Sequence, residues 1–169
     1  MTTSWQRVRQ FVNAVTARLS AEERAWIDGA LPAAARPLFY AMHPADQVHA
    51  LRVAQTALQL AAGARVDRPF LVRCCLLHDV GRVRGDLDIF GKVWAVLAHH
   101  FAPDWSMRMG KSGRIHFLQV YYGHPRIGAE KLRRAGLARE AAVIERHHEP
   151  PTPADSPVLR LLKAADGRN

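Results

Sequence analysis

The chain has 169 residues, 49% of them hydrophobic and 23% charged, and it carries a formal net charge of +9. It is long enough for one domain with its own core, its composition excludes a disordered or fibrous protein, and no run approaches the roughly 20 apolar residues of a membrane span. The polar first ten residues lack the apolar centre of a signal peptide, so we expect a cytoplasmic protein. The positive charge favours phosphate-bearing partners but is equally typical of an arginine-biased proteome.

The first elements predicted along the chain are short helices. Apolar residues recur at helical spacing over Trp5–Leu19, and the segment Ser20-Ala21-Glu22-Glu23 is a capping box that opens a second helix. Pro32 and Pro37 then break the chain around a short helix. We expect residues 1–42 to form an accessory helical layer on the rest of the protein.

Two strong helices follow. Pro44 to Ala62 has a long helical pattern, and the apolar run from Phe70 to Leu77 indicates a buried helix that ends near Val80-Gly81. This run contains the only cysteines, Cys74 and Cys75. Adjacent cysteines are poor disulfide partners, so we expect both to be free and to pack as small hydrophobic residues.

The C-terminal half continues the helical pattern. Pro125 is expected to lie in the first turn of a helix. No stretch alternates with period two for long enough to form a strand, so we predict an all-helical single domain (1–169) of about seven to nine helices, with residues 43–169 as its core. The predicted segments are a helix over Asp88–Phe101, a loop over Ala102–Gly113, helices over Ile115–Tyr122 and from Pro125 to Gly136, and helices over Leu137–His148 and Pro157–Asp166.

Several histidines and two aspartates fall on helix faces that are otherwise apolar. His49 shares a face with Val53, and Asp166 follows Leu162 by one turn and Val158 by two. Each inward histidine alone is more often a hydrogen-bonded core residue, but their joint occurrence with two carboxylates indicates a cation site, because burying carboxylates without a partner is costly. The set is His49, His78, Asp79, His147, His148 and Asp166.

The order of these residues, with His124 included, resembles the HD superfamily of metal-dependent phosphohydrolases. The match runs from about His43 to Asp166, and Arg82 stands where a lysine is usual. Each segment alone is a weak signal, but five in the right order are a strong one. The segments that carry the resemblance are His49-Ala-Leu-Arg-Val-Ala54, Leu76-Leu-His-Asp-Val-Gly-Arg82, His124-Pro-Arg-Ile-Gly-Ala129, Ile144-Glu-Arg-His-His-Glu149 and Ala164-Ala-Asp166.

The resemblance implies an HD-domain helical bundle that holds divalent cations, two of them by expectation, with Mn, Fe, Mg, Co and Ni not distinguished. Paired cations clamp a phosphoryl group for in-line attack. His148 is expected to be a ligand or an outer group at the same site. The implied ligands are His49, His78, Asp79 and Asp166 for the first cation, and His124 and His147 for the second, with Asp79 bridging.

Catalysis would then depend on His78, Asp79 and Arg82. Arg82, Arg126 and Lys92 are candidates to bind substrate phosphate, because guanidinium and ammonium groups pair with phosphate oxygens.

The departures from the family pattern narrow the substrate. The subfamily that cleaves cyclic dinucleotides carries Gly-Tyr-Pro after its double histidine, whereas this chain has Glu149-Pro-Pro-Thr-Pro153. Ala45 stands where members with three metals place a glutamate, so a third metal is not expected. His99 and His100 compete with His124 for the second cation but lack its Pro-x-x-Gly context. Tyr121, Tyr122 and the loop over 102–113 are expected to line the pocket.

Three functions therefore stay open. The first is hydrolysis of a phosphate ester on a nucleotide or another small phosphorylated metabolite. The second is oxidation by dioxygen, since some HD-fold proteins hold two irons with the same ligand set. The third is a non-catalytic nucleotide or nucleic-acid binding module, which the net charge allows but the intact ligand set disfavours. Nothing in the sequence indicates the oligomeric state.

Overall fold

The computed structural model describes residues 18–82, 98, 101–112 and 114–169 of the chain. Within these residues it contains eight helices and no strand, which confirms the all-helical prediction. None of these helices is long and apolar enough to cross a membrane. In chain order they are α2 (Ala21–Ala30), α3 (Arg36–Tyr40), α4 (Pro44–Leu60), α5 (Arg68–Leu77), α7 (Pro103–Lys111), α8 (His116–Arg134), α9 (Ala138–Ile144) and α10 (Pro157–Asp166).

Local chemistry determines where several of these helices begin and end. The predicted capping box at the start of α2 is present: Glu23 N–H donates to Ser20 Oγ (3.1 Å), and Ser20 N–H donates to Glu23 Oε2 (2.7 Å). Asp67 caps α5 and Ser156 caps α10 in the same manner. Two glycines with positive φ follow α4 and α8, namely Gly63 (78°) and Gly136 (79°), where an L side chain would be strained.

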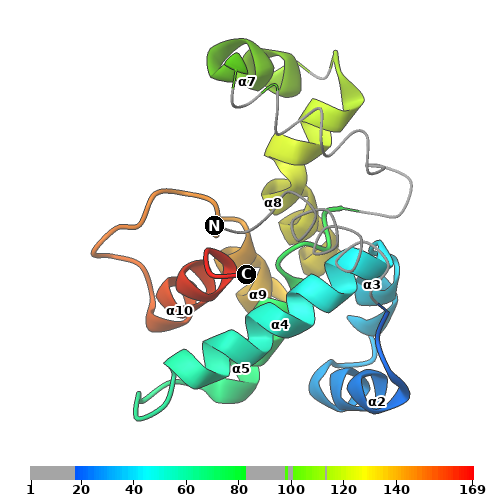
Figure 1. Cartoon of the computed structure of the whole chain (residues 1–169), viewed down its shortest axis with the longest axis vertical. Coiled ribbons are helices and arrows are strands. Elements are labelled where there is room, and N and C mark those ends of the chain that lie inside the picture. The colour runs from blue at the N-terminus through cyan, green and yellow to red at the C-terminus, as the bar shows by residue number, and fades with distance from the viewer. Residues whose placement is uncertain (1–17, 83–97, 99–100, 113) are drawn as a thin grey trace, which may run out of the picture.

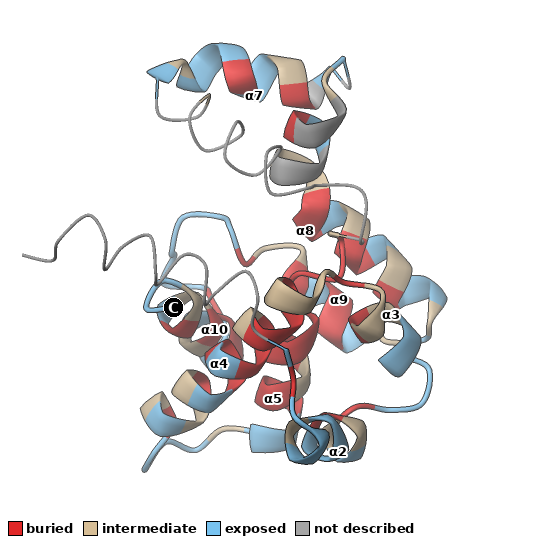
Figure 2. Cartoon of the chain, turned by 45° about the vertical axis from the view of Figure 1, so that its right-hand side comes forward, coloured by how far each residue is buried: buried red, intermediate tan, exposed pale blue. Residues whose placement is uncertain are grey.

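The helices pack around α4 and α5. α4 contacts both α5 and α10, α5 contacts α9 and α10, and α8 contacts α7 and α9 (Figure 1). Buried residues concentrate where α4, α5, α9 and α10 meet, whereas α7 and the start of α8 stand apart from this centre (Figure 2). Buried apolar side chains from Leu19 to Ala165 form one cluster, so the elements that carry the candidate residues share one core.

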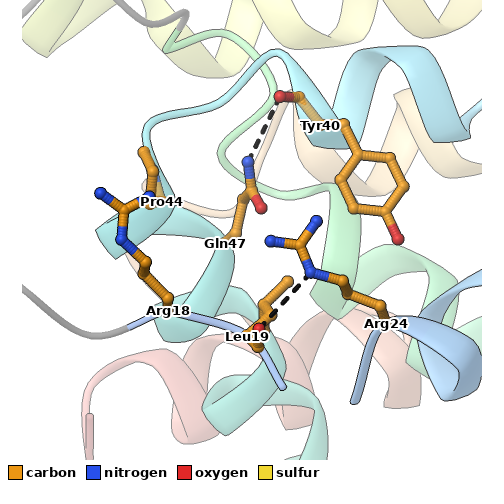
Figure 3. A pocket seen from close by; sticks show the side chains of 6 residues that line it. All are labelled: Arg18, Leu19, Arg24, Tyr40, Pro44 and Gln47. Carbon is orange, nitrogen blue, oxygen red and sulfur yellow. Dashed lines mark hydrogen bonds between the residues drawn. The ribbon is translucent and has the colours of Figure 1, made fainter. Parts of the chain in front are cut away.

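The two described helices before α4 pack against α4 and α5. α2 packs on α5, and α3 packs on both α4 and α5. Gln47 Nε2 donates to the carbonyls of Tyr40 (3.3 Å) and Met42 (2.9 Å), beside a hollow of about 280 Å³ that also faces Arg18 and Arg24 (Figure 3). These bonds connect α3 and the residues that follow it to the helix that carries His49.

Two expectations about the C-terminal half are wrong. The segment predicted as a loop over 102–113 contains helix α7, and Pro125 lies inside α8 instead of opening a helix. Gly110 lies in this segment, and a Cβ there would lie 2.7 Å from Tyr122 Cδ2 and 2.8 Å from the carbonyl oxygen of Leu118. The glycine therefore permits close packing of α7 on α8, and that packing overrides its local preference for a loop.

Two predicted helices cannot be compared with the structure. The helix over Trp5–Leu19 falls almost wholly outside the described residues, and so does most of the helix over Asp88–Phe101.

Candidate metal centre

The structure brings the seven predicted ligand residues together from five parts of the chain. Their potential ligand atoms form three overlapping groups, within each of which all atoms lie within 4.8 Å of one another. Most of these residues lie at the end of a helix or directly after it. The residues are His49 on α4, His78 and Asp79 directly after α5, His124 on α8, His147 and His148 in the turn after α9, and Asp166 at the end of α10.

One side of the centre pairs imidazoles with the two carboxylates. His49 Nε2 lies 3.0 Å from Asp166 Oδ1. His78 Nε2 lies 3.6 Å from the same oxygen and 3.5 Å from Asp79 Oδ2. His78 and Asp79 are each 1% exposed, whereas His49 and Asp166 are partly open to solvent. Asp79 thus lies on the buried side of this group of residues, and Asp166 lies on its solvent-facing side.

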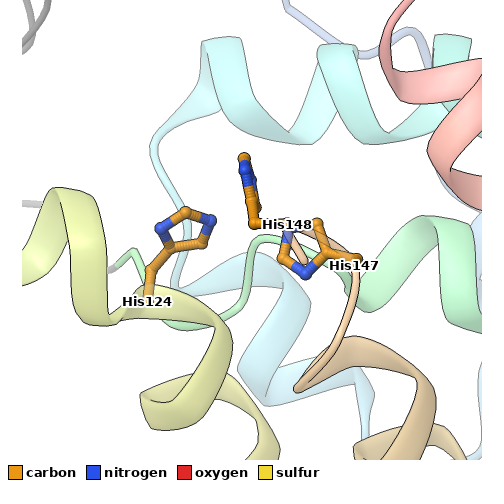
Figure 4. A group of neighbouring side chains, drawn as sticks. All are labelled: His124, His147 and His148. Carbon is orange, nitrogen blue, oxygen red and sulfur yellow. The ribbon is translucent and has the colours of Figure 1, made fainter. Parts of the chain in front are cut away.

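The other side consists of three imidazoles (Figure 4). The ring centroid of His148 lies 4.2 Å from that of His147 and 4.8 Å from that of His124. His124 and His147 are buried, and their centroids are 5.4 Å apart. His148 keeps part of its surface exposed. His124 Nε2 lies 3.2 Å from Asp79 Oδ1, which joins this side of the centre to the first.

The hydrogen bonds of the rings show which nitrogen faces the centre. His78 Nδ1–H donates to the carbonyl of Cys75 (2.8 Å), and His147 Nδ1–H donates to the carbonyl of Ile144 (2.6 Å). Nε2 is therefore the nitrogen of each ring that faces the interior, and in a neutral ring it carries a lone pair that a cation can bind. The described residues provide no hydrogen-bond donor for His147 Nε2 or for Asp79 Oδ1.

These acceptor atoms fit a divalent cation. His78 Nε2 lies 3.5 and 3.6 Å from carboxylate oxygens of Asp79 and Asp166, so a proton or a bound cation must lie among these three acceptor atoms. Buried acceptors without donors are costly, and imidazole nitrogens with carboxylate oxygens are a common ligand set for divalent first-row metals. The backbone carbonyls that orient His78 and His147 are the usual outer partners of metal-binding histidines.

Arg82 is also part of the centre. Its Nη1 donates to Asp79 Oδ2 (2.8 Å), and its Nη2 lies 3.2 Å from His124 Nε2. Its side chain is 19% exposed, so most of the guanidinium stem is covered. The arginine predicted to hold substrate phosphate therefore contacts two of the predicted ligands in this structure.

The pKa shifts reflect burial and the charges close by. Burial alone would raise the pKa of Asp79, but Arg82 and the neighbouring histidines hold it well below its usual range. Burial opposes ionisation of Asp166 too, yet its bond with His49 lowers its pKa to about 2. Burial lowers the pKa of His147 well below 6.5 and that of His148 to about 4. Both carboxylates are therefore ionised, and both of these histidines are neutral, near pH 7.

Two glycines allow α8 to reach the centre. A Cβ on Gly81 would lie 2.0 Å from the carbonyl oxygen of His124, and a Cβ on Gly128 would lie 3.1 Å from the amide nitrogen of Gly81. Lys131 Nζ adds a bond to the carbonyl of Val80 (3.3 Å). The backbone of α8 thus lies directly on the segment that follows Asp79, which places His124 beside that carboxylate.

Both glycines belong to the segments that resemble the HD superfamily, but no role for them was predicted from the sequence. The signal was available, because a glycine two residues after His78-Asp79 and another four after His124 are positions where a missing Cβ permits close approach.

Other predicted residues are not brought into the group. Arg126 is exposed and lines a hollow of about 410 Å³ between α7 and α8, together with Tyr122. Two residues along a helix differ by about 200°, so Arg126 and His124 lie on different sides of α8. His43 caps α4 by accepting from the amide of Ala45 (3.3 Å). Lys92, His99, His100 and the side chain of Tyr121 lie outside the described residues.

Comparison with known proteins agrees with this geometry. The family model of the HD domain matches residues 47–168, which covers most of the chain and every residue of the centre. No curated protein and no solved structure gives a significant match. The HD superfamily consists largely of metal-dependent phosphohydrolases whose domains bind divalent metals. With the matching segments, the helical architecture and the histidine–aspartate centre in agreement, the chain belongs to the HD domain family.

Proposed function

We propose that the protein is a metal-dependent phosphohydrolase that acts on a nucleotide or another small phosphorylated metabolite. The observation that carries this proposal is the convergence of two ionised carboxylates and inward-facing Nε2 atoms at the junction of five elements. Such a group is costly in a folded protein unless cations occupy it. Membership of the HD family supplies the reaction class.

The chain's residues would divide the work between holding cations and binding phosphate. His49, His78, Asp79 and Asp166 would hold a first divalent cation, and His124 and His147 offer lone pairs for a second, with His148 at its exposed edge. Bound cations at such a site polarise the phosphoryl group and lower the pKa of water. The carbonyls of Cys75 and Ile144 keep the rings of His78 and His147 oriented for this task.

The positive charge of the protein, and of Arg82 in particular, is the basis on which we propose phosphate recognition. The chain carries a net charge of +9, and Arg82 places a guanidinium within the centre, where it can pair with phosphate oxygens. Arg126 and Lys92 stay as candidates for phosphate binding from outside the group. Neither geometry nor charge favours one base or sugar, so the substrate class is defined by its phosphate ester.

A panel of phosphomonoesters and phosphodiesters, assayed with Mn²⁺, tests the proposal. We expect hydrolysis of at least one ester by the wild-type protein and a loss of about 1000-fold or more in kcat/KM in Asp79→Asn, since the cations supply several kcal/mol of stabilisation. Asp67→Asn is the matched control, because Asp67 lies at the opposite end of α5 and asparagine caps helices equally well.

Three results would contradict the proposal. Hydrolysis that is unchanged in Asp79→Asn would show that this centre does not catalyse it. Tightly bound iron with oxygen consumption and no phosphate release would indicate an oxygenase on the same ligand set. Salt-sensitive nucleic-acid binding that ignores Asp79→Asn, in a protein without hydrolytic activity, would indicate a binding module.

A further inference from the structure

Arg82 occupies the side of the centre where a second cation would bind. The chain turns after Asp79, and the Arg82 side chain returns to donate from Nη1 to Asp79 Oδ2 (2.8 Å). Its other terminal nitrogen, Nη2, lies 3.2 Å from Nε2 of His124. One planar group therefore spans the two residues that join the carboxylate side of the centre to its histidine side.

The contact with His124 uses the lone pair that a cation would need. A guanidinium is always protonated and has only donors, so His124 Nε2 is the acceptor in this pair. A ring nitrogen that accepts this bond cannot also donate to Asp79 Oδ1, although the two atoms are only 3.2 Å apart. The lack of a donor for Asp79 Oδ1 agrees with this assignment.

The first cation site is affected less. His78 Nε2 and His49 Nε2 face Asp166 Oδ1 at 3.6 and 3.0 Å, and among the described residues Arg82 makes no hydrogen bond to any of these three. Of the first site's ligands Arg82 bonds only Asp79, at the Oδ2 atom that also lies 3.5 Å from His78 Nε2. The guanidinium and a second cation would thus compete for His124 Nε2, while the first cation would keep His49, His78 and Asp166 and share Asp79 with Arg82.

We infer that Arg82 is a built-in competitor of the second cation, so that the chain binds one divalent cation tightly and a second only after Arg82 has left His124. This inference rests on the proposed metal-dependent function. Arg82 is a positioning residue in this role: with one cation bound, its fixed charge stands beside Asp79 in place of the second metal. The two cation sites are therefore unequal, although the centre contains ligands for both.

Calorimetric titration of Mn²⁺ into the metal-free protein tests the inference. We expect the wild type to show one tight site and a second site at least about tenfold weaker. Arg82→Gln removes the charge and the donor fork, so its second site should tighten by about tenfold or more, while its first site, where Arg82 bonds only one ligand, should change less. Arg134→Gln is the matched control, because Arg134 is an exposed arginine on α8 that pairs with Glu130.

A second variant and a second readout keep the test decisive. Arg82→Lys keeps a charge beside Asp79 but cannot bond both partners with one planar group, so its second site should fall between those of wild type and Arg82→Gln. Electron paramagnetic resonance at two equivalents of Mn²⁺ should show a coupled pair of ions in Arg82→Gln and mainly single ions in the wild type.

Two equally tight sites in the wild type, or a second site that Arg82→Gln weakens, would overturn the inference and leave the proposed function intact. If neither protein binds Mn²⁺, the metal centre itself is wrong, and the inference fails with it. The titration therefore distinguishes the two failures.

Discussion

At the scale of single residues, the centre depends on how the histidine rings are oriented, that is, on which ring nitrogen bonds the backbone and which one faces the interior. His78 and His147 both lie three residues after the carbonyl that receives their Nδ1–H, so the ends of α5 and α9 orient both rings by the same local geometry. The consequence is that both Nε2 atoms point inward before any cation binds. Preorganised ligands of this kind lose little freedom on binding.

The neutral state of His147 and His148 predicts how the metal-free protein responds to acid. Burial lowers the pKa of His147 well below 6.5 and that of His148 to about 4. The unfolded chain takes up these two protons below pH 6.5 and the folded chain does not, so stability falls as the pH decreases from 6.5 towards 4. His49 acts in the opposite sense, because its raised pKa adds stability below 6.5 that is lost as the pH rises.

Thermal unfolding of the metal-free protein at pH 7 and pH 5 measures this balance. We expect a lower Tm at pH 5, and a smaller pH-dependent loss in His147→Gln, which has no titrating group at that position. An equal loss in both proteins would show that protonation of His147 does not couple to unfolding.

Gly81 provides a sharper test of the geometry. In Gly81→Ala the new methyl group would lie 2.0 Å from the carbonyl oxygen of His124, and no rotamer change relieves a clash with backbone. We expect a loss of about 2 kcal/mol in the free energy of unfolding, together with weaker Mn²⁺ binding.

Gly29→Ala is the control for this substitution, since nothing lies within 4 Å of its added methyl group. Alanine in a helix should be neutral or stabilising there, by up to about 1 kcal/mol. If chemical denaturation gives the same stability for both variants, α8 does not approach the Asp79 segment as described.

At the scale of elements, the sequence predicted helices well where their ends carry their own signals. α10 begins and ends where its pattern indicated, and α2 has the predicted capping box. Prediction failed at α7, where Gly110 permits close helix packing, and at Pro125, which is buried inside α8. A single sequence does not show which neighbour a glycine approaches, so these errors have a physical cause.

The loop between α9 and α10 is held by a buried carboxylate. Asp155 accepts bonds from Lys163 Nζ (2.7 Å), Thr152 Oγ1 (2.8 Å) and Arg146 Nη2 (3.2 Å). These bonds connect the segment after His148 to α10, which carries Asp166. The bond from Lys163, with that from Thr152, lowers the pKa of Asp155 to about 2.

Asp155→Asn should therefore lower the Tm, because the uncharged amide loses the attraction to Lys163 and Arg146. A carboxylate whose pKa is lowered from 3.8 to about 2 contributes stability above pH 3.8 that is lost as the pH falls through 2. The Tm difference between wild type and variant should accordingly shrink between pH 4 and pH 2. A difference that stays constant over this range would contradict the role given to the charge.

At the scale of the whole molecule, the sequence predicted the members of the centre better than their arrangement. Helical periodicity placed His49 and Asp166 on inward faces, and the order of segments added His124. It did not show that Arg82 bonds both Asp79 and His124, because that contact joins residues 42 positions apart through a side chain with many rotamers. The close approach of Gly81 to α8 was hidden for the same reason.

The metal content of the purified protein tests the central claim most directly. Elemental analysis after dialysis against Mn²⁺ and then against metal-free buffer should find at least one ion per chain in the wild type and in Asp67→Asn. Asp79→Asn should retain essentially none, since Asp79 contributes to both sides of the centre. A wild-type protein that retains no metal, or an Asp79→Asn variant that retains as much as the wild type, would contradict the account.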